Sequence, residues 1–134
     1  WGWRLLDPGW QSTFAKSDTY PRAYSTSNKK VLVLFTDGNP YLKPWDNEKL
    51  SKSEKEQYQA DALDDFKQVC KAIKADGRID LFVIGYGSTL SSDEINELRA
   101  CVAGDGAFMT ADKNNLSAVF NSILKSSMAI ALSR

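Results

Sequence analysis

Two kinds of hydrophobic pattern alternate along the chain. Residues 31–35 and 79–87 are nearly continuous apolar runs, rich in β-branched and aromatic side chains, and each ends in turn-forming residues. Runs of this length and composition are typical of strands buried on both faces of a sheet. Residues 107–110 form a shorter run of the same kind. The pattern therefore predicts three strands.

Between and after these runs, apolar residues recur every three or four positions, which predicts amphipathic helices. The first helix is expected over residues 52–75, with a capping box at its start from Ser51 with Glu54 or from Ser53 with Glu56. A shorter helix begins at residues 91–92, and a third is expected over 115–131. The residues expected on the buried faces are Ala62, Leu63, Phe66, Val69, Cys70, Ile73, Ile95, Leu98, Cys101, Val102, Leu116, Val119, Phe120, Ile123 and Leu124.

The resulting order, β-α-β-α-β-α, predicts an α/β fold of Rossmann-like type, with a mostly parallel sheet and helices on both faces. We treat residues 1–134 as a single domain. Three strands make a small sheet, and the strand at 31–35 would leave a long apolar edge. We therefore expect the domain to be partial, with an upstream segment or a second chain adding strands beside residues 31–35.

Two stretches lack any sustained periodicity. Residues 1–28 combine aromatic residues with Pro and Gly, and we expect a long irregular segment with at most one helical turn. Residues 39–50 form a second polar and aromatic loop that contains Tyr41 and Trp45. The aromatic residues of both stretches would either form a recognition surface, or cover the missing half of the sheet or fill satellite cores, and we favour the second interpretation. These residues are Trp1, Trp3, Trp10, Tyr41 and Trp45.

Composition excludes several classes of function. Seventeen acidic residues balance seventeen basic ones, so no broad basic face for nucleic acid is expected. The chain has no histidine, which excludes His-based nucleophilic catalysis and His-ligated zinc. No apolar run approaches the roughly 18 residues that a membrane span requires.

The candidate chemistry lies at Thr36, Asp37 and Gly38, directly after the first strand. Ligands of open parallel sheets bind beyond the carboxyl ends of the strands. Asp37 offers a carboxylate to a hard cation, Thr36 a hydroxyl, and Gly38 lets the backbone turn away. An Asp-Gly turn without any ligand is the alternative. One carboxylate is also too few for Mg²⁺ or Ca²⁺, which take six or more oxygen ligands.

The strand at 31–35 with its Thr36-Asp37-Gly38 corner resembles the fourth strand of von Willebrand factor A-type domains, and residues 79–87 resemble the next strand. In that family the Thr-Asp-Gly corner supplies the last element of the metal-ion-dependent adhesion site. The segment at residues 3–10 and the tail at 98–134 resemble TadG-type proteins of the Flp (Tad) pilus assembly system. The resemblance covers nearly the whole chain and implies the C-terminal half of such a domain.

One departure limits what the resemblance implies. The family's first metal motif, Asp-x-Ser-x-Ser after a buried strand, is absent, and the threonine ligand of its middle loop cannot be placed in this chain. Asp37 and Thr36 would then be part of an incomplete site. Mg²⁺, or Mn²⁺ or Ca²⁺, would bind only if a partner supplies the missing half.

The resemblance implies a non-catalytic binding, adhesion or assembly module of the bacterial cell envelope, acting on a protein partner. One alternative is a Mg²⁺-dependent phosphoryl-transfer enzyme that uses Asp37, although the sequence has neither a phosphate-binding loop nor a second acid next to Asp37. The other alternative is a structural half-domain without metal.

The two cysteines, Cys70 and Cys101, are by themselves a weak disulfide signal, and two buried thiols are the alternative. TadG-type proteins have cysteines at about these places, on the two helices that flank one strand, and the resemblance therefore implies a Cys70–Cys101 disulfide. Such a bridge would contribute roughly 3–4 kcal/mol in the chain-entropy model. It would also place the domain outside the cytoplasm, in the periplasm, on the cell surface or in the medium.

The disulfide prediction is checked by titrating thiols in denaturant without reductant. We expect no reactive thiol before reduction and two afterwards, because both cysteines are in the bridge. Two reactive thiols before reduction would contradict it.

Overall fold

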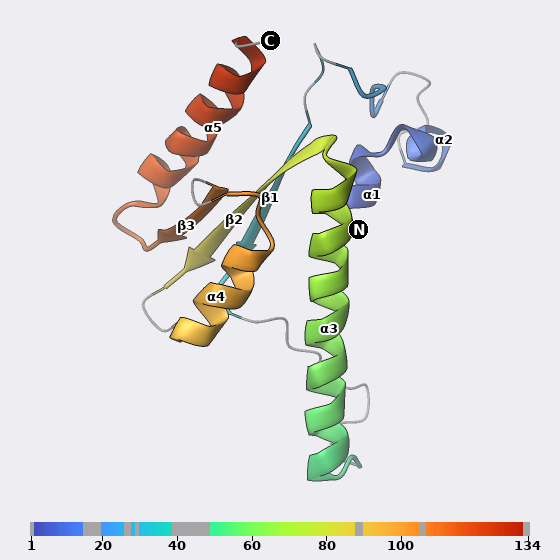
Figure 1. Ribbon diagram of the computed structural model, residues 1–134, viewed down its shortest axis with the longest axis vertical. Helices are drawn as coiled ribbons and strands as arrows, with labels where there is room; N and C mark the ends of the chain where they lie inside the picture. Colours follow the sequence, from blue (N-terminus) through green and yellow to red (C-terminus); the bar gives the residue numbers. More distant parts are fainter. Residues whose placement is uncertain are drawn as a thin grey trace.

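The computed structural model describes residues 2–14, 20–25, 28, 30–38, 49–87, 90–104 and 107–132. Its sheet has three strands: β1 (Lys30–Thr36), β2 (Ile79–Tyr86) and β3 (Phe108–Ala111). All pairings are parallel, and the strands lie side by side in the order β1-β2-β3. Figure 1 shows β2 in the middle of the sheet. The predicted α/β fold with a parallel sheet is confirmed.

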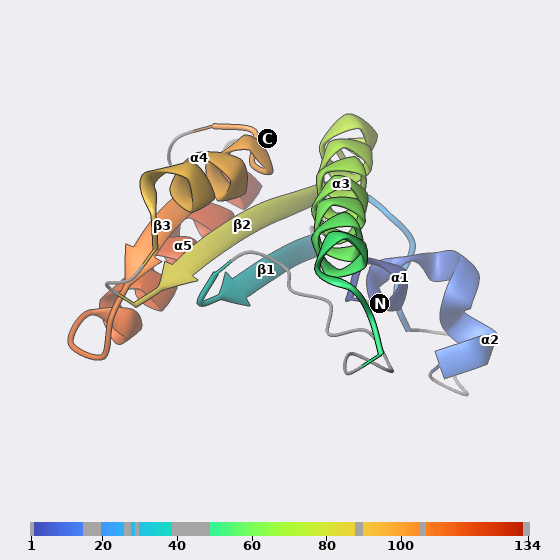
Figure 2. The same ribbon diagram turned by 90° about the horizontal axis from the view of Figure 1, so that it is seen from below.

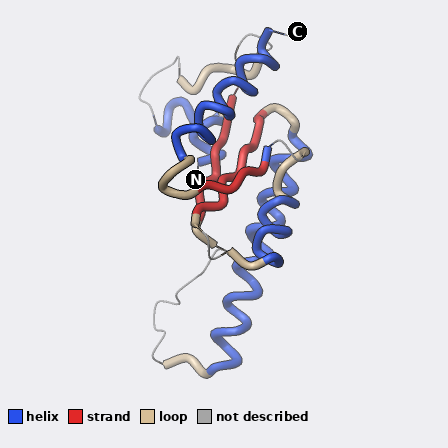
Figure 3. Tube along the Cα trace, turned by 90° about the vertical axis from the view of Figure 1, so that its left-hand side faces the viewer, coloured by secondary structure: helices blue, strands red, loops and turns tan. Residues whose placement is uncertain are grey.

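Helices lie on both faces of this sheet, as expected. Helix α3 (Lys52–Asp76) and helix α4 (Ser92–Ala100) pack on one face, and helix α5 (Leu116–Leu132) packs on the other. Figures 2 and 3 show the strands between these two layers. The connection from each strand to the next contains a helix, as parallel neighbours require.

The core is built on β2, whose successive side chains point to opposite faces. Val83 packs with Cys70 and Leu98 under α3 and α4. Ile84 packs with Ile123 on the α5 side. Val83 and Ile84 are both 0% exposed, so β2 is the doubly buried strand that its composition predicts.

Strand β1 differs from this expectation. Its residues from Val31 to Leu34 are half-buried, and Phe35 is 47% exposed. The reason is its position: β1 pairs with β2 on one side, and among the described residues no strand pairs with its other side. The predicted open edge is therefore present.

Helix α3 has a well-defined cap at each end. Ser51 and Glu54 form the capping box, which settles the choice between the two predicted boxes. Gly77 ends the helix in the left-handed conformation with φ of 65°, and its N–H donates to the carbonyl of Ile73. The buried residues of α3 are Ala62, Cys70 and Ile73, so none falls in its first ten residues, and Figure 1 shows this amino-terminal part extending beyond the sheet.

A disulfide joins the layer formed by α3 and α4. It connects Cys70 in α3 with Cys101, the residue that follows α4, and their Cα atoms are 4.8 Å apart. Both cysteines are buried in the same cluster as Val83. The bridge spans 31 residues of sequence and includes β2 in its loop, so it stabilises the central part of the fold.

The amino-terminal segment is more ordered than predicted. Residues expected to be irregular form three short helices: α1 (Gly2–Leu6), the 3₁₀ helix η1 (Pro8–Trp10) and α2 (Gln11–Phe14). Asp7 caps η1 by accepting a hydrogen bond from the N–H of Gly9. Elements of one turn have no periodicity to detect, and their caps are the only sequence signal.

This segment is attached to the amino end of the sheet through Lys30. The buried Lys30 ammonium donates to the carbonyl of Leu6 and lies 4.2 Å from the ring centre of Tyr24. The Arg78 guanidinium lies 4.2 Å from the same ring centre. Burial lowers the pKa of Lys30, although nearby Asp7 opposes the shift.

The aromatic residues of the segment differ in exposure, and Tyr20 is 56% exposed. Trp3 and Trp10 are half-buried, and the guanidinium of Arg4 lies 5.3 Å from the Trp10 ring centre. Trp1, and the loop residues 39–48 with Tyr41 and Trp45, lie outside the described residues.

Three predicted core residues are exposed. Val69 in α3 is 48% exposed, while Phe120 and Leu124 in α5 are 40% and 60% exposed. The helical pattern is correct, but each helix contacts the sheet along one stripe only, and the side chains at the margin of that stripe stay exposed. Phe120 and Leu124, with Met128 at 64% exposed, therefore leave an apolar strip uncovered by the described residues.

Replacing Leu98 by Ala should lower the free energy of unfolding by about 2–5 kcal/mol, because Leu98 is 0% exposed and its removal leaves a cavity. The control is Leu124→Ala in the exposed strip, which should change it by about 0.5 kcal/mol or less. Urea denaturation of both variants measures the difference. Equal losses would show that α5 is covered in solution.

Candidate functional site

The candidate corner lies at the carboxyl end of β1. Thr36 is the last residue of the strand, and Asp37 and Gly38 follow it. The side chain of Asp37 is exposed, while Thr36 and Gly38 are half-buried. The carboxylate thus lies just beyond the end of a parallel strand, as predicted.

The hydroxyl of Thr36 closes the turn. Its Oγ1 accepts a hydrogen bond from the N–H of Gly38 at 3.2 Å and donates to the carbonyl of Gly38 at 2.6 Å. These contacts hold the backbone in the turn that presents Asp37. Thr36 is a predicted metal ligand, whereas in this conformation its hydroxyl forms hydrogen bonds with the backbone of Gly38.

The neighbouring strand ends beside this corner at two glycines that flank Tyr86, whose ring centre lies 5.2 Å from that of Phe35. Thr36 pairs with Gly85 of β2. A Cβ atom on Gly85 would come within 2.7 Å of the Leu90 side chain, so glycine allows Leu90 to pack against the strand end. Gly87 has φ of 102°, and its N–H donates to the carbonyl of Ala111 at 2.8 Å. Both strand ends therefore open onto one edge of the sheet.

A second carboxylate, that of Glu94, lies near this edge. Glu94 is in the first turn of α4, and it accepts hydrogen bonds from the N–H and the hydroxyl of Ser91. Its other carboxylate oxygen, Oε1, is 3.5 Å from where a Cβ on Gly38 would stand. Sequence reasoning missed Glu94, although the Ser91–Glu94 capping box after the second strand was an available signal.

These residues by themselves do not make a site for a divalent cation. Within the described ranges, no group of three or more His, Cys, Asp or Glu side chains could hold a metal ion. Asp37 and Glu94 supply two carboxylates, and Thr36 bonds to Gly38, whereas Mg²⁺ and Ca²⁺ take six or more oxygens. The chemistry of this edge is that of an acidic corner on a rigid strand end.

Comparisons of the chain with protein-family models, with curated proteins and with solved structures find no match. Among the helices that the structure describes, none is long and apolar enough to cross a membrane.

The role of Thr36 in the corner is tested by Thr36→Val, which keeps the shape of the side chain but removes both hydrogen bonds to Gly38. We expect a loss of about 1 kcal/mol in the free energy of unfolding. Amide hydrogen exchange at Gly38 should also become faster. Thr36→Ser is the control, because it keeps the hydroxyl. Identical exchange at Gly38 in both variants would contradict the assignment.

Proposed function

We propose that the chain is part of a non-catalytic adhesion or assembly module of the bacterial cell envelope, of the von Willebrand A type. In this proposal Asp37 is one element of a metal-ion-dependent adhesion site that a partner segment completes. The observation that carries the proposal is the position of Asp37: an exposed carboxylate at the carboxyl end of the edge strand β1.

The arrangement of the sheet supports the site. Three parallel strands follow one another in sequence order, and their carboxyl ends share one edge. Ligands of open parallel sheets bind beyond that edge. The Thr36 turn holds Asp37 there, and Glu94 adds negative charge close by.

The open side of β1 supports the need for a partner. Strand β1 is apolar but only half-buried, and an exposed apolar edge favours pairing with another strand. Strands added beside β1, from an upstream segment or a second chain, would bury it. Their own carboxyl ends would bring further oxygen ligands next to Asp37 if they run parallel to β1.

The disulfide supports the proposed compartment. Disulfides persist in oxidising surroundings and are rare in the cytoplasm, so Cys70–Cys101 favours an extracytoplasmic location. A role in pilus biogenesis or surface attachment rests on the resemblance of the flanking segments to TadG-type proteins.

A non-catalytic role is favoured by what the whole sequence contains. It has no histidine and no Gly-rich loop ending in Lys-Ser or Lys-Thr. In a sequence without such a phosphate-binding loop, an acidic corner suits ligation of a cation shared with a partner's carboxylate better than phosphoryl transfer.

The test is calorimetric titration with MgCl₂ and MnCl₂ of two proteins: this chain, and the chain lengthened by any residues that its gene encodes upstream of Trp1. We expect saturable binding in the lengthened protein alone, because the present residues offer too few ligands. The variant Asp37→Ala in the lengthened protein should abolish the binding.

The control is Asp61→Ala, which removes an exposed carboxylate of α3 remote from the corner and should leave binding unchanged. Absence of binding in both proteins, or binding that survives Asp37→Ala, would overturn the metal site. Turnover of p-nitrophenyl phosphate that requires Asp37 would overturn the non-catalytic role.

A further inference from the structure

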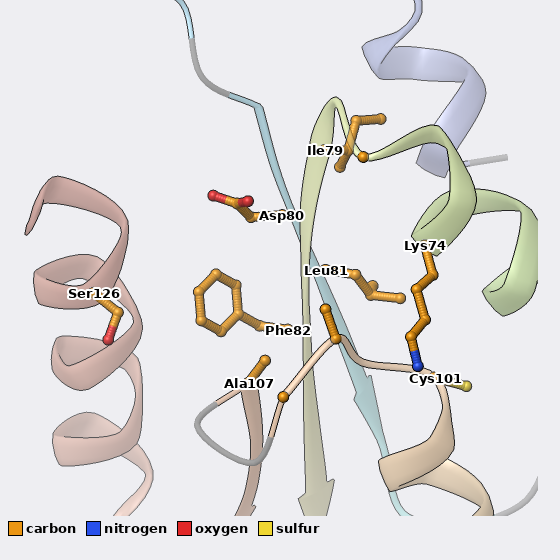
Figure 4. Close-up of a pocket in the computed structure, with 11 residues that line it drawn as sticks. Lys74, Ile79, Asp80, Leu81, Phe82, Cys101, Ala107 and Ser126 are labelled. Carbon is orange, nitrogen blue, oxygen red and sulfur yellow. The ribbon is translucent and has the colours of Figure 1, made fainter. Parts of the chain in front are cut away.

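A pocket of about 440 Å³ lies beside the amino-terminal half of β2, in the size range of small-ligand sites. It is lined by strand residues, by the end of α3, by the segment after α4 and by α5, as Figure 4 shows. Apolar side chains dominate the lining, with Leu81, Phe82, Cys101 and Ala107 among them. The corner at Asp37 lies at the opposite end of the sheet.

The pocket exists because β3 is shorter than β2. The first residue pair between these strands is Val83 with Phe108, so the four residues from Ile79 to Phe82 precede it. On that side of β2, no strand among the described residues accompanies them. At about 3.3 Å per residue, this leaves roughly 13 Å of strand edge facing the pocket.

The main-chain N–H and C=O groups along this edge are oriented so that a further strand could pair with them. In a parallel sheet, the N–H and C=O groups of alternate residues point to the same neighbour. The N–H of Gly87 donates to Ala111 of β3, so alternate residues back along β2 also face the β3 side. Ile79 and Leu81 belong to this set, and their N–H and C=O groups therefore point toward the pocket.

We propose that this pocket binds an extended peptide segment of a partner protein, which adds to β2 as a short strand in line with β3. Addition of a strand to a free sheet edge is a recurring mode of peptide recognition: main-chain hydrogen bonds give affinity and alternate side-chain pockets give specificity. An apolar small molecule would fill the volume but leave the groups of Ile79 and Leu81 without that partner.

The charges of the pocket define the peptide further. Figure 4 shows Lys74 and Leu81 on the α3 side of β2, and Asp80 and Phe82 on the α5 side. Neighbouring residues of a bound strand point to opposite faces. The complementary peptide therefore has an acidic residue facing Lys74, a basic residue next to it facing Asp80, and small apolar residues on either side.

The experiment uses the full chain labelled with ¹⁵N and an acetylated, amidated hexapeptide, Ala-Val-Glu-Lys-Val-Ala. Titration followed by NMR should give saturable shifts at the amides of Ile79, Leu81 and Ala107. Two further peptides carry N-methyl groups on alternate residues. In one peptide the odd-numbered residues are methylated, and in the other the even-numbered residues are. Because only one set of N–H groups faces β2, their affinities should differ by about tenfold.

Variants locate the site. Ala103 is exposed and lines the pocket, so Ala103→Phe should block the peptide without unfolding the protein. Ala60→Phe places the same side chain on the exposed part of α3 and should leave binding unchanged. Lys74→Glu should weaken it. Absence of saturable shifts, equal affinity of the two N-methylated peptides, or full binding by Ala103→Phe would each overturn the proposal.

Discussion

The structure depends on burying β2 on both of its faces. Val83 and Ile84 are adjacent in sequence, fully buried and on opposite sides, so two separate helical layers must be present at once. The disulfide closes the first layer by joining α3 to the residue after α4, and α5 forms the second. Since the layers are centred on β2 and β3, β1 receives only partial cover. The open edge of the sheet and the exposed acidic corner both follow from this imbalance.

Much of the fold could be predicted because its elements are long enough to show a period. Continuous apolar runs indicated β2 and β3, and three- and four-residue spacing indicated α3 and α5 close to their observed bounds. The exposure of individual helix residues was harder to predict. An apolar stripe shows which face of a helix packs against the sheet, but it does not show how wide the sheet is beneath that face. Phe120 therefore fits the pattern and is nonetheless 40% exposed. The short helices before residue 15 are too brief to have any period.

The candidate site was predictable to the extent that it is local in sequence. A strand followed at once by Thr36, Asp37 and Gly38 defines a corner whose position in a parallel sheet is known beforehand. The approach of Glu94 to Gly38 could not be predicted, because it depends on how α4 lies over the strand ends, and only tertiary packing determines that. The pocket beside Leu81 arises from a difference in length between two paired strands, a property that neither strand shows alone.

The pairing of β1 with a strand that comes after α3 also orders events in time. As the chain is synthesised, the apolar segment from Val31 to Phe35 exists well before Ile79 and its successors, with which it pairs. Until then both of its edges are available to other chains, which is a known hazard of parallel sheets. Translation thus delays the pairing of β1, and anything that slows elongation through α3 lengthens the time for which its edges stay unpaired.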